Sequence, residues 1–218
     1  MTLNILLLGP QGSGKGTQAK RISTEYGIPH IATGDMLRAA IAAGTPLGRR
    51  VKPILESGRL VSDELMTELI RDRLGDDDAR EGFVLDGFPR TIAQAEALDA
   101  MLREIGRDLT IVFELQISDE RCIERLLKRA AEEGRADDTP ETIGRRLALY
   151  HRETEPLVEH YRVAGNVVGV HAEGTVNEVF SEIQQALEQA AQRPAGERGP
   201  AEGVAGGREV PPATSRTS

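Results

Sequence analysis

Asn4-Ile5-Leu6-Leu7-Leu8-Gly9-Pro10-Gln11-Gly12-Ser13-Gly14-Lys15-Gly16-Thr17 is the stretch of sequence from which the fold is inferred. It begins as a short run of Ile and Leu that stops at Gly-Pro, a pattern typical of a strand buried on both faces of a parallel sheet. The glycines that follow allow a tight turn, in which successive backbone N–H groups point into one concavity. Because helix-forming residues come next, the sequence predicts a phosphate-binding loop at a helix N-terminus.

The lysine of this stretch strengthens the prediction. Lys15 adds a full positive charge within reach of the terminal phosphates of a nucleotide. The spacing matches Gly-x-x-x-x-Gly-Lys, although Gly16 stands where the general motif has Ser or Thr, and Thr17 comes one residue later. The loop alone does not identify a reaction, because the same cradle serves ATPases, GTPases and kinases.

Composition narrows the class of protein. The 218 residues suffice for one α/β domain with small insertions, or at most two domains. A net charge of -8 gives no electrostatic reason to expect a nucleic-acid partner. The single cysteine, Cys122, rules out an internal disulfide and argues against a zinc site. No signal peptide and no apolar run of membrane-spanning length is present, so we expect a cytoplasmic chain that does not enter membranes.

Strand-like and helix-like segments alternate along the chain. Strands are predicted near residues 4–8, 28–33, 83–86, 109–117 and 166–171, and helices near residues 14–26, 33–43, 47–56, 62–74, 91–105, 118–131, 139–163 and 175–192. This alternation predicts an α/β fold of three layers, α/β/α, with a parallel five-stranded sheet. Residues 193–218 are rich in Pro and Gly and lack large apolar side chains, so we expect a disordered tail, with a docking segment as the alternative.

Ligands of such sheets bind beyond the carboxyl ends of the strands. This rule places the glycine-rich loop, Thr33, Asp86 and the residues after His171 along one edge of the sheet. Asp86 ends a buried-type strand opposite the loop and is expected to orient Mg²⁺ through water, since Mg²⁺ retains several of its waters. The structural alternative is an aspartate that stabilises a turn or caps a helix.

Arginines recur beside these motifs, and their planar bidentate donors suit phosphate. Any one of them could simply occupy a solvated helix face. Arg90 departs most from that alternative, since it follows Asp86 and a Gly-Phe-Pro turn. The candidates are Arg38, Arg90, Arg125, Arg129, Arg135 and Arg146.

Three motifs together resemble the adenylate kinase family. They are the stretch from Gly9 to Thr17, then Thr33-Gly34-Asp35-Met36-Leu37-Arg38, and then Asp86-Gly87-Phe88-Pro89-Arg90-Thr91. The resemblance covers about residues 3–187, and Gly16, unusual for the general motif, is usual in this family. It implies a P-loop NTPase fold in residues 1–192, with a helical flap for the nucleoside monophosphate at about 32–61 and a short lid at about 128–138.

The resemblance also implies an activity and a set of residues. The activity is the reversible reaction of ATP and AMP to two ADP with Mg²⁺, in a chain that we expect to be monomeric. Catalytic roles fall on Lys15, Asp86, Arg90, Arg125, Arg129, Arg135 and Arg146. ATP contacts fall on Gly12, Ser13, Gly14, Lys15, Gly16, Thr17, Arg129 and Gly174. AMP contacts fall on Thr33, Arg38, Arg59, Leu60, Val61, Gly87, Phe88, Pro89, Arg90, Gln94, Arg135 and Arg146.

Two residues bear on the choice of acceptor. Thr91-x-x-Gln94 forms a capping-box pattern, which would explain Gln94 structurally. The family places an adenine-recognising glutamine at this position, and an amide offers the donor and acceptor that an adenine edge requires. Relatives specific for pyrimidine monophosphates usually have a smaller residue at the position of Thr33. Thr33 and Gln94 therefore favour AMP over UMP or CMP. The alternative from another functional class is a non-catalytic protein that binds nucleotides and senses adenylates.

Overall fold

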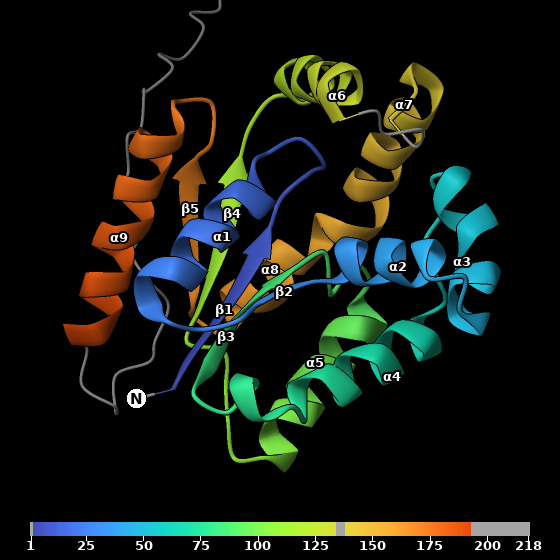
Figure 1. Ribbon diagram of the computed structural model, residues 1–218. Helices are drawn as coiled ribbons and strands as arrows, with labels where there is room; N and C mark the ends of the chain where they lie inside the picture. Colours follow the sequence, from blue (N-terminus) through green and yellow to red (C-terminus); the bar gives the residue numbers. More distant parts are fainter. Residues whose placement is uncertain (1, 134–137, 193–218) are drawn as a thin grey trace, which may run out of the picture.

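The computed structural model describes residues 2–133 and 138–192. Its central sheet has five parallel strands in the order β2-β3-β1-β4-β5 (Figure 1). The strands are β1 (Leu3–Leu8), β2 (His30–Ala32), β3 (Gly82–Asp86), β4 (Ile111–Gln116) and β5 (Val167–His171). The predicted parallel α/β architecture is therefore confirmed.

Helices connect the strands and cover both faces of the sheet (Figure 1). They are α1 (Lys15–Tyr26), α2 (Thr33–Ala42), α3 (Pro46–Glu56), α4 (Asp63–Leu74), the 3-10 turn η1 (Asp77–Ala79), α5 (Ile92–Glu104), α6 (Asp119–Glu133), α7 (Pro140–Leu149), the π-helical turn η2 (Tyr150–Thr154), α8 (Pro156–Val163) and α9 (Val176–Gln192). None of the helices among these described residues is long and apolar enough to cross a lipid bilayer.

Strand β1 contributes to the core on both of its faces. Ile5 and Leu7 belong to the apolar cluster formed with α1 and α9, whereas Leu6 and Leu8 belong to the cluster formed with α4, α5 and α8. Alternate side chains of a strand point to opposite faces, so one short apolar run fills both cores. The prediction of a strand buried on both faces is confirmed, and β1 lies at the centre of the sheet between β3 and β4.

One predicted helix is divided. Residues 139–163 form α7 and α8, with the π-helical turn η2 between them. Pro156 has no N–H to continue the helical ladder, and the Glu155 N–H donates to Tyr150 O, five residues back (2.9 Å). Tyr150 and Thr154, the first and last residues of this turn, both line the central cleft.

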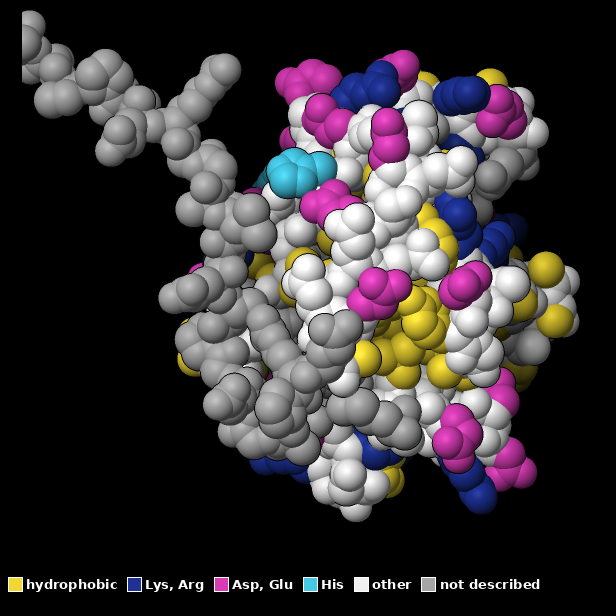
Figure 2. Space-filling model, turned by 90° about the vertical axis from the view of Figure 1, so that its left-hand side faces the viewer, with side chains coloured by type: hydrophobic (Ala, Val, Ile, Leu, Met, Phe, Trp, Pro, Cys, Tyr) yellow, Lys and Arg dark blue, Asp and Glu magenta, His cyan; other side chains and the backbone are white. Residues whose placement is uncertain are grey.

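Acidic and basic side chains are mixed on the surface. On the face shown in Figure 2, acidic side chains are spread among uncharged ones, and the described residues form no broad basic area there. This distribution agrees with the net charge of -8.

Candidate functional site

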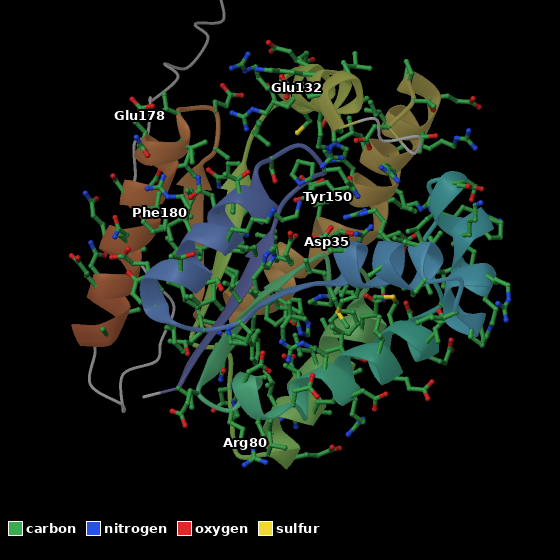
Figure 3. All side chains as sticks on the ribbon, in the orientation of Figure 1. Asp35, Arg80, Glu132, Tyr150, Glu178 and Phe180 are labelled. Carbon is green, nitrogen blue, oxygen red and sulfur yellow. The ribbon has the colours of Figure 1, made fainter. Side chains whose placement is uncertain are left out.

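A cleft of about 320 Å³ lies at the carboxyl ends of the strands. It brings together most of the residues selected from the sequence: Gly12, Gly14, Lys15, Gly16, Thr17, Thr33, Arg38, Arg59, Leu60, Val61, Asp86, Gly87, Pro89, Arg90, Gln94, Arg129 and Arg146. Figure 3 labels two further lining residues, Asp35 at the start of α2 and Tyr150 at the end of α7, which come from separate parts of the chain.

The glycine-rich loop has the backbone geometry that the sequence predicts. Gly12 and Gly14 have φ angles of 88° and 96°, which are strained for other residues. A Cβ at Gly12 would also lie 2.7 Å from the carbonyl oxygen of Cys122 on α6. The loop ends at the first turn of α1, where N–H groups have no partner within the helix and the helix dipole favours an anion.

Lys15 is folded back onto this loop. Its Nζ donates to Gly9 O at 2.7 Å and to Pro10 O at 2.8 Å. Burial within the loop lowers the pKa of the ammonium to about 8, while the carboxylate of Asp86 acts in the opposite direction. The charge is therefore held beside the concavity by neutral carbonyls, from which a phosphate can attract it.

Asp86 faces the start of α1 from the end of β3. A Cβ at Gly16 would lie 3.5 Å from Asp86 Oδ2, and the ring Nε2 of His30 lies 3.6 Å from the same oxygen. Burial alone would raise the pKa of Asp86, but the proximity of His30, Lys15 and Arg90 outweighs it and lowers that pKa. The carboxylate is therefore ionised at neutral pH.

The segment after β3 positions Arg90. Its Nε donates to Gly87 O at 2.8 Å, and its backbone N–H donates to Gln94 Oε1 at 2.8 Å. The hydroxyl of Thr154 donates to Arg90 O at 2.9 Å. Because both backbone groups and the guanidinium are anchored, Arg90 presents its remaining donors to the cleft in a fixed orientation.

Asp138 joins two arginines that line the cleft, Arg129 and Arg146. Its side chain is fully buried, and Oδ2 accepts from Arg129 Nη2 at 2.6 Å while Oδ1 accepts from Arg146 Nη1 at 2.9 Å. One carboxylate thus holds two cationic groups that both line the cleft.

Thr33 and Gln94, the two residues from which AMP was predicted as the acceptor, both line the cleft. Thr33 is buried, and its hydroxyl donates to Asp86 O at 3.4 Å. Gln94 is also buried, and its N–H donates to Thr91 Oγ1 at 3.2 Å. In a full capping box its side chain would bond the Thr91 N–H, but Oε1 instead accepts from the Arg90 N–H. The capping box predicted from the sequence is therefore only half formed.

Some predicted residues do not line the cleft. Ser13 is buried beneath the loop, and the Phe88 side chain is buried in the core. Arg125 lies between the loop and the β5–α9 connection, with Nη1 3.5 Å from Ser13 O and Nη2 3.4 Å from Glu173 O. Gly174 belongs to that same connection. Arg135 lies outside the described residues, together with the rest of segment 134–137 of the predicted lid.

Sequence reasoning did not assign Tyr150, Thr154 or His30 to the site, although all three line the cleft. Tyr150 and Thr154 follow Arg146 by four and eight residues, a helical spacing that could have placed them near its face of the helix. His30 lies beside Asp86. The strand-end rule does not identify it, because His30 begins β2 and pairs with Val84, so its proximity to Asp86 depends on the register between β2 and β3.

Comparisons with known proteins agree with this geometry. A family model described as "Adenylate kinase" matches residues 7–166. The chain is 49% identical to "Adenylate kinase" of Caulobacter vibrioides over 186 residues, which cover 85% of this chain and 97% of that protein. It is 49% identical to "Adenylate kinase" of Maricaulis maris over 187 residues, which are 86% of this chain and 100% of the relative. It is 50% identical to "Adenylate kinase" of Micrococcus luteus over 183 residues, which cover 84% of this chain and 89% of that protein.

Proposed function

The chain belongs to the adenylate kinase family, and we propose from this premise that the cleft holds ATP and AMP end to end. The phosphotransferase activity moves the γ-phosphoryl group of ATP to AMP and yields two ADP. The observation that carries the proposal is the convergence of the phosphate loop, Arg90 and the pair Arg129–Arg146 on a single cleft. Two polyanions can share such a site only if cations from several segments neutralise them.

The donor half is assigned to the loop. The N–H groups at the start of α1 would accept the phosphates of ATP, while Lys15 would leave the carbonyls of Gly9 and Pro10 for the terminal phosphates. Arg125 would support the donor side from its position between Ser13 and the β5–α9 connection. Gly174 in that connection is assigned to the adenine of ATP by the family resemblance.

The acceptor half is assigned to residues of α2, of the segment after β3 and of α5. Arg38 and Arg90 would bind the phosphate of AMP, whereas Thr33 and Gln94 would contact its adenine. Residues 59–61 and 87–89 complete this half by the family resemblance, and most of them line the cleft. AMP brings a largely dianionic phosphate at neutral pH, so its attacking oxygen needs no general base.

Mg²⁺ fits the donors that are present. Among the described residues no cluster of three His, Cys, Asp or Glu side chains could hold a metal by itself. Asp86 is ionised and faces the loop. A single carboxylate suits an ion held mainly by nucleotide phosphates and water. When bound, Mg²⁺ neutralises charge on the β- and γ-phosphates. No zinc is proposed.

We propose a monomer that works on the cytoplasmic adenylate pool and binds neither nucleic acid nor membrane. Residues 32–61 would close over the nucleotides, together with a lid at about 128–138, of which residues 134–137 lie outside the described structure. Closure would exclude water and prevent hydrolysis of ATP.

An acceptor panel tests this function. Wild-type protein is assayed with ATP and, in turn, AMP, CMP, UMP or GMP, and ADP formation is followed by a coupled assay. AMP is expected to give the highest kcat/KM, because Gln94 offers the donor–acceptor pair that matches adenine. A preference for CMP or UMP would contradict the assignment of Thr33 and Gln94. Tight binding of ATP and AMP without any ADP would favour the non-catalytic sensor instead.

A further inference from the structure

Gln94 makes a contact that its role in the cleft does not require. Its Nε2 donates to Oδ1 of Asp63 at 2.7 Å, across from α5 to the first turn of α4. Gln94 lines the cleft and is buried, whereas Asp63 is only partly buried and does not line it. The two residues are separated by 31 positions, so the bond belongs to the tertiary structure.

The two neighbours of the Gln94 amide have opposite hydrogen-bonding character. The Arg90 backbone N–H can only donate, and it donates to Oε1 at 2.8 Å. An ionised Asp63 carboxylate can only accept, and it accepts from Nε2. If the amide were rotated by half a turn, its NH₂ would face a donor and its oxygen would face a carboxylate. One of the two amide orientations is therefore strongly favoured.

In the favoured orientation, each end of the amide keeps one unused hydrogen-bonding position. Oε1 has a second lone pair, and Nε2 has a second N–H. Together they form an acceptor beside a donor, which matches the 6-amino group and N1 of adenine. A 6-oxopurine such as inosine monophosphate presents the reverse pattern, with an acceptor at position 6 and N1–H as donor, and it needs the disfavoured orientation.

We propose that Asp63 is a specificity-determining positioning residue, which orients the Gln94 amide so that the cleft accepts 6-aminopurine and rejects 6-oxopurine monophosphates. The inference rests on the proposed function, because it takes Gln94 as the group that contacts the base of the acceptor. Asp63 itself does not touch the nucleotide and acts through Gln94.

The test uses full-length protein and two acceptors. Dissociation constants of AMP and inosine monophosphate are measured by titration calorimetry for wild type and Asp63→Asn. An asparagine keeps the size of the side chain but can donate as well as accept, so it no longer opposes the reversed amide, and only the Arg90 N–H still does. The preference for AMP is expected to fall roughly tenfold, the equivalent of one hydrogen bond. Because both affinities come from one preparation, their ratio does not depend on the fraction of folded protein.

Two variants serve as matched controls. Glu64→Gln removes the same charge from the next residue of α4, which is exposed, and its preference is expected to equal that of wild type. Asp63→Glu keeps an acceptor-only carboxylate and is expected to retain most of the preference. A loss of preference in Glu64→Gln equal to that in Asp63→Asn would overturn the proposal, since it would show a general effect of charge.

A double variant separates this inference from the proposed function. In a Gln94→Leu background the amide is absent, so Asp63→Asn is expected to leave the preference unchanged. If Asp63→Asn alone changes nothing while Gln94→Leu reduces the preference, the role of Asp63 is wrong and that of Gln94 stands. If Gln94→Leu changes nothing either, both roles are wrong, and formation of ADP from ATP and AMP by the wild type still tests the activity independently.

Discussion

Arg129 and Arg146 are bound to the two oxygens of one carboxylate, that of Asp138, at 2.6 Å and 2.9 Å. The carboxylate is fully buried, whereas Arg129 and Arg146 retain 31% and 13% of their side-chain exposure at the cleft. A buried anion thus keeps two cations close together on the wall that faces the phosphate loop. Without it, two like charges would repel each other at the place where the transferred phosphoryl group is expected.

Replacing this carboxylate should reduce both stability and activity. Asp138→Asn is expected to lower the free energy of unfolding by about 3 kcal/mol, because it breaks a buried charged network. It should also lower kcat roughly tenfold or more, since the two arginines lose their fixed positions. Urea unfolding and steady-state kinetics measure the two effects. Glu141→Gln, which removes an exposed ion pair with Arg145, should change stability by only about 0.5 kcal/mol. Equal effects of the two variants would contradict the role of Asp138.

The pKa of Lys15 predicts an alkaline limit to ATP capture. Burial lowers that pKa to about 8 in the nucleotide-free protein, so the ammonium is lost as the pH rises through this value. We expect kcat/KM for ATP to fall above about pH 8. The limb of kcat should lie at higher pH, because bound phosphates favour the charged lysine. A profile of kcat/KM that stays flat to about pH 10 would show that Lys15 does not act as a cation in ATP capture.

Lys15 also predicts a trend in stability. Its folded-state pKa of about 8 is below the ordinary 10.5, so between these values the unfolded chain binds more protons than the folded one. The contribution of Lys15 to the free energy of unfolding should therefore rise with pH across this window. Urea unfolding of wild type and Lys15→Met measures it as the free energy of unfolding of the wild type minus that of the variant. A difference that falls with rising pH would contradict the expectation.

Two glycines form a matched pair with opposite expected effects. Gly12→Ala adds a Cβ 2.7 Å from Cys122 O at a φ of 88°, and it should cost on the order of 2 kcal/mol and weaken ATP binding. Gly144 lies within α7, and a Cβ there would meet no atom within 4 Å. Gly144→Ala should stabilise the protein by about 0.5–1 kcal/mol without changing kcat. Thermal unfolding and ATP titration measure these effects. A Gly12→Ala variant with unchanged stability and ATP affinity would refute the tight contact between the loop and α6.

His151 links α6 to the π-helical turn and should make stability depend on pH. Its Nδ1 lies 2.9 Å from Glu155 Oε2, and its Nε2 lies 3.0 Å from Asp119 Oδ1. Hydrogen bonds to Glu155 and Asp119 raise the pKa of the imidazole above its ordinary 6.5. The stabilisation is therefore complete below 6.5 and is lost as the pH rises through the folded-state pKa.

The variant His151→Gln isolates this contribution. The difference in the free energy of unfolding between wild type and variant should be larger at about pH 6 than at about pH 9. Both pairs are substantially exposed, so the difference should also shrink in high salt. A difference that is independent of pH would show that the imidazole stabilises the protein only through packing.

The fold and the centre of the site followed from local patterns. The apolar run before Gly9 predicted a doubly buried strand, and glycine spacing predicted the loop, because both depend on short-range backbone and solvation preferences. The rule for strand ends then brought the glycine-rich loop, Thr33 and Asp86 to one edge, and all three line the cleft, whereas the residues after His171 do not. These inferences needed no knowledge of tertiary contacts.

Other features depend on contacts between distant segments. The bond from Gln94 to Asp63 and the approach of Thr154 to Arg90 join residues 31 and 64 positions apart. The π-helical turn between α7 and α8 was also not predicted, because a helical pattern of constant period carries no signal for it. The same limit applies to Gln94. The capping-box pattern offered a bond to the Thr91 N–H as one interpretation, but in the fold the Gln94 side chain accepts from the neighbouring Arg90 N–H.

The central claim is direct transfer of phosphate between two nucleotides in one cleft. It is tested most directly by incubating the protein with ATP labelled at the γ-phosphate, AMP and Mg²⁺, with Lys15→Met as the negative control. The account predicts that the label appears as the β-phosphate of ADP formed from AMP, and that the variant loses this transfer by roughly a hundredfold or more. Release of the label as inorganic phosphate, or no AMP-dependent loss of label from ATP, would contradict it.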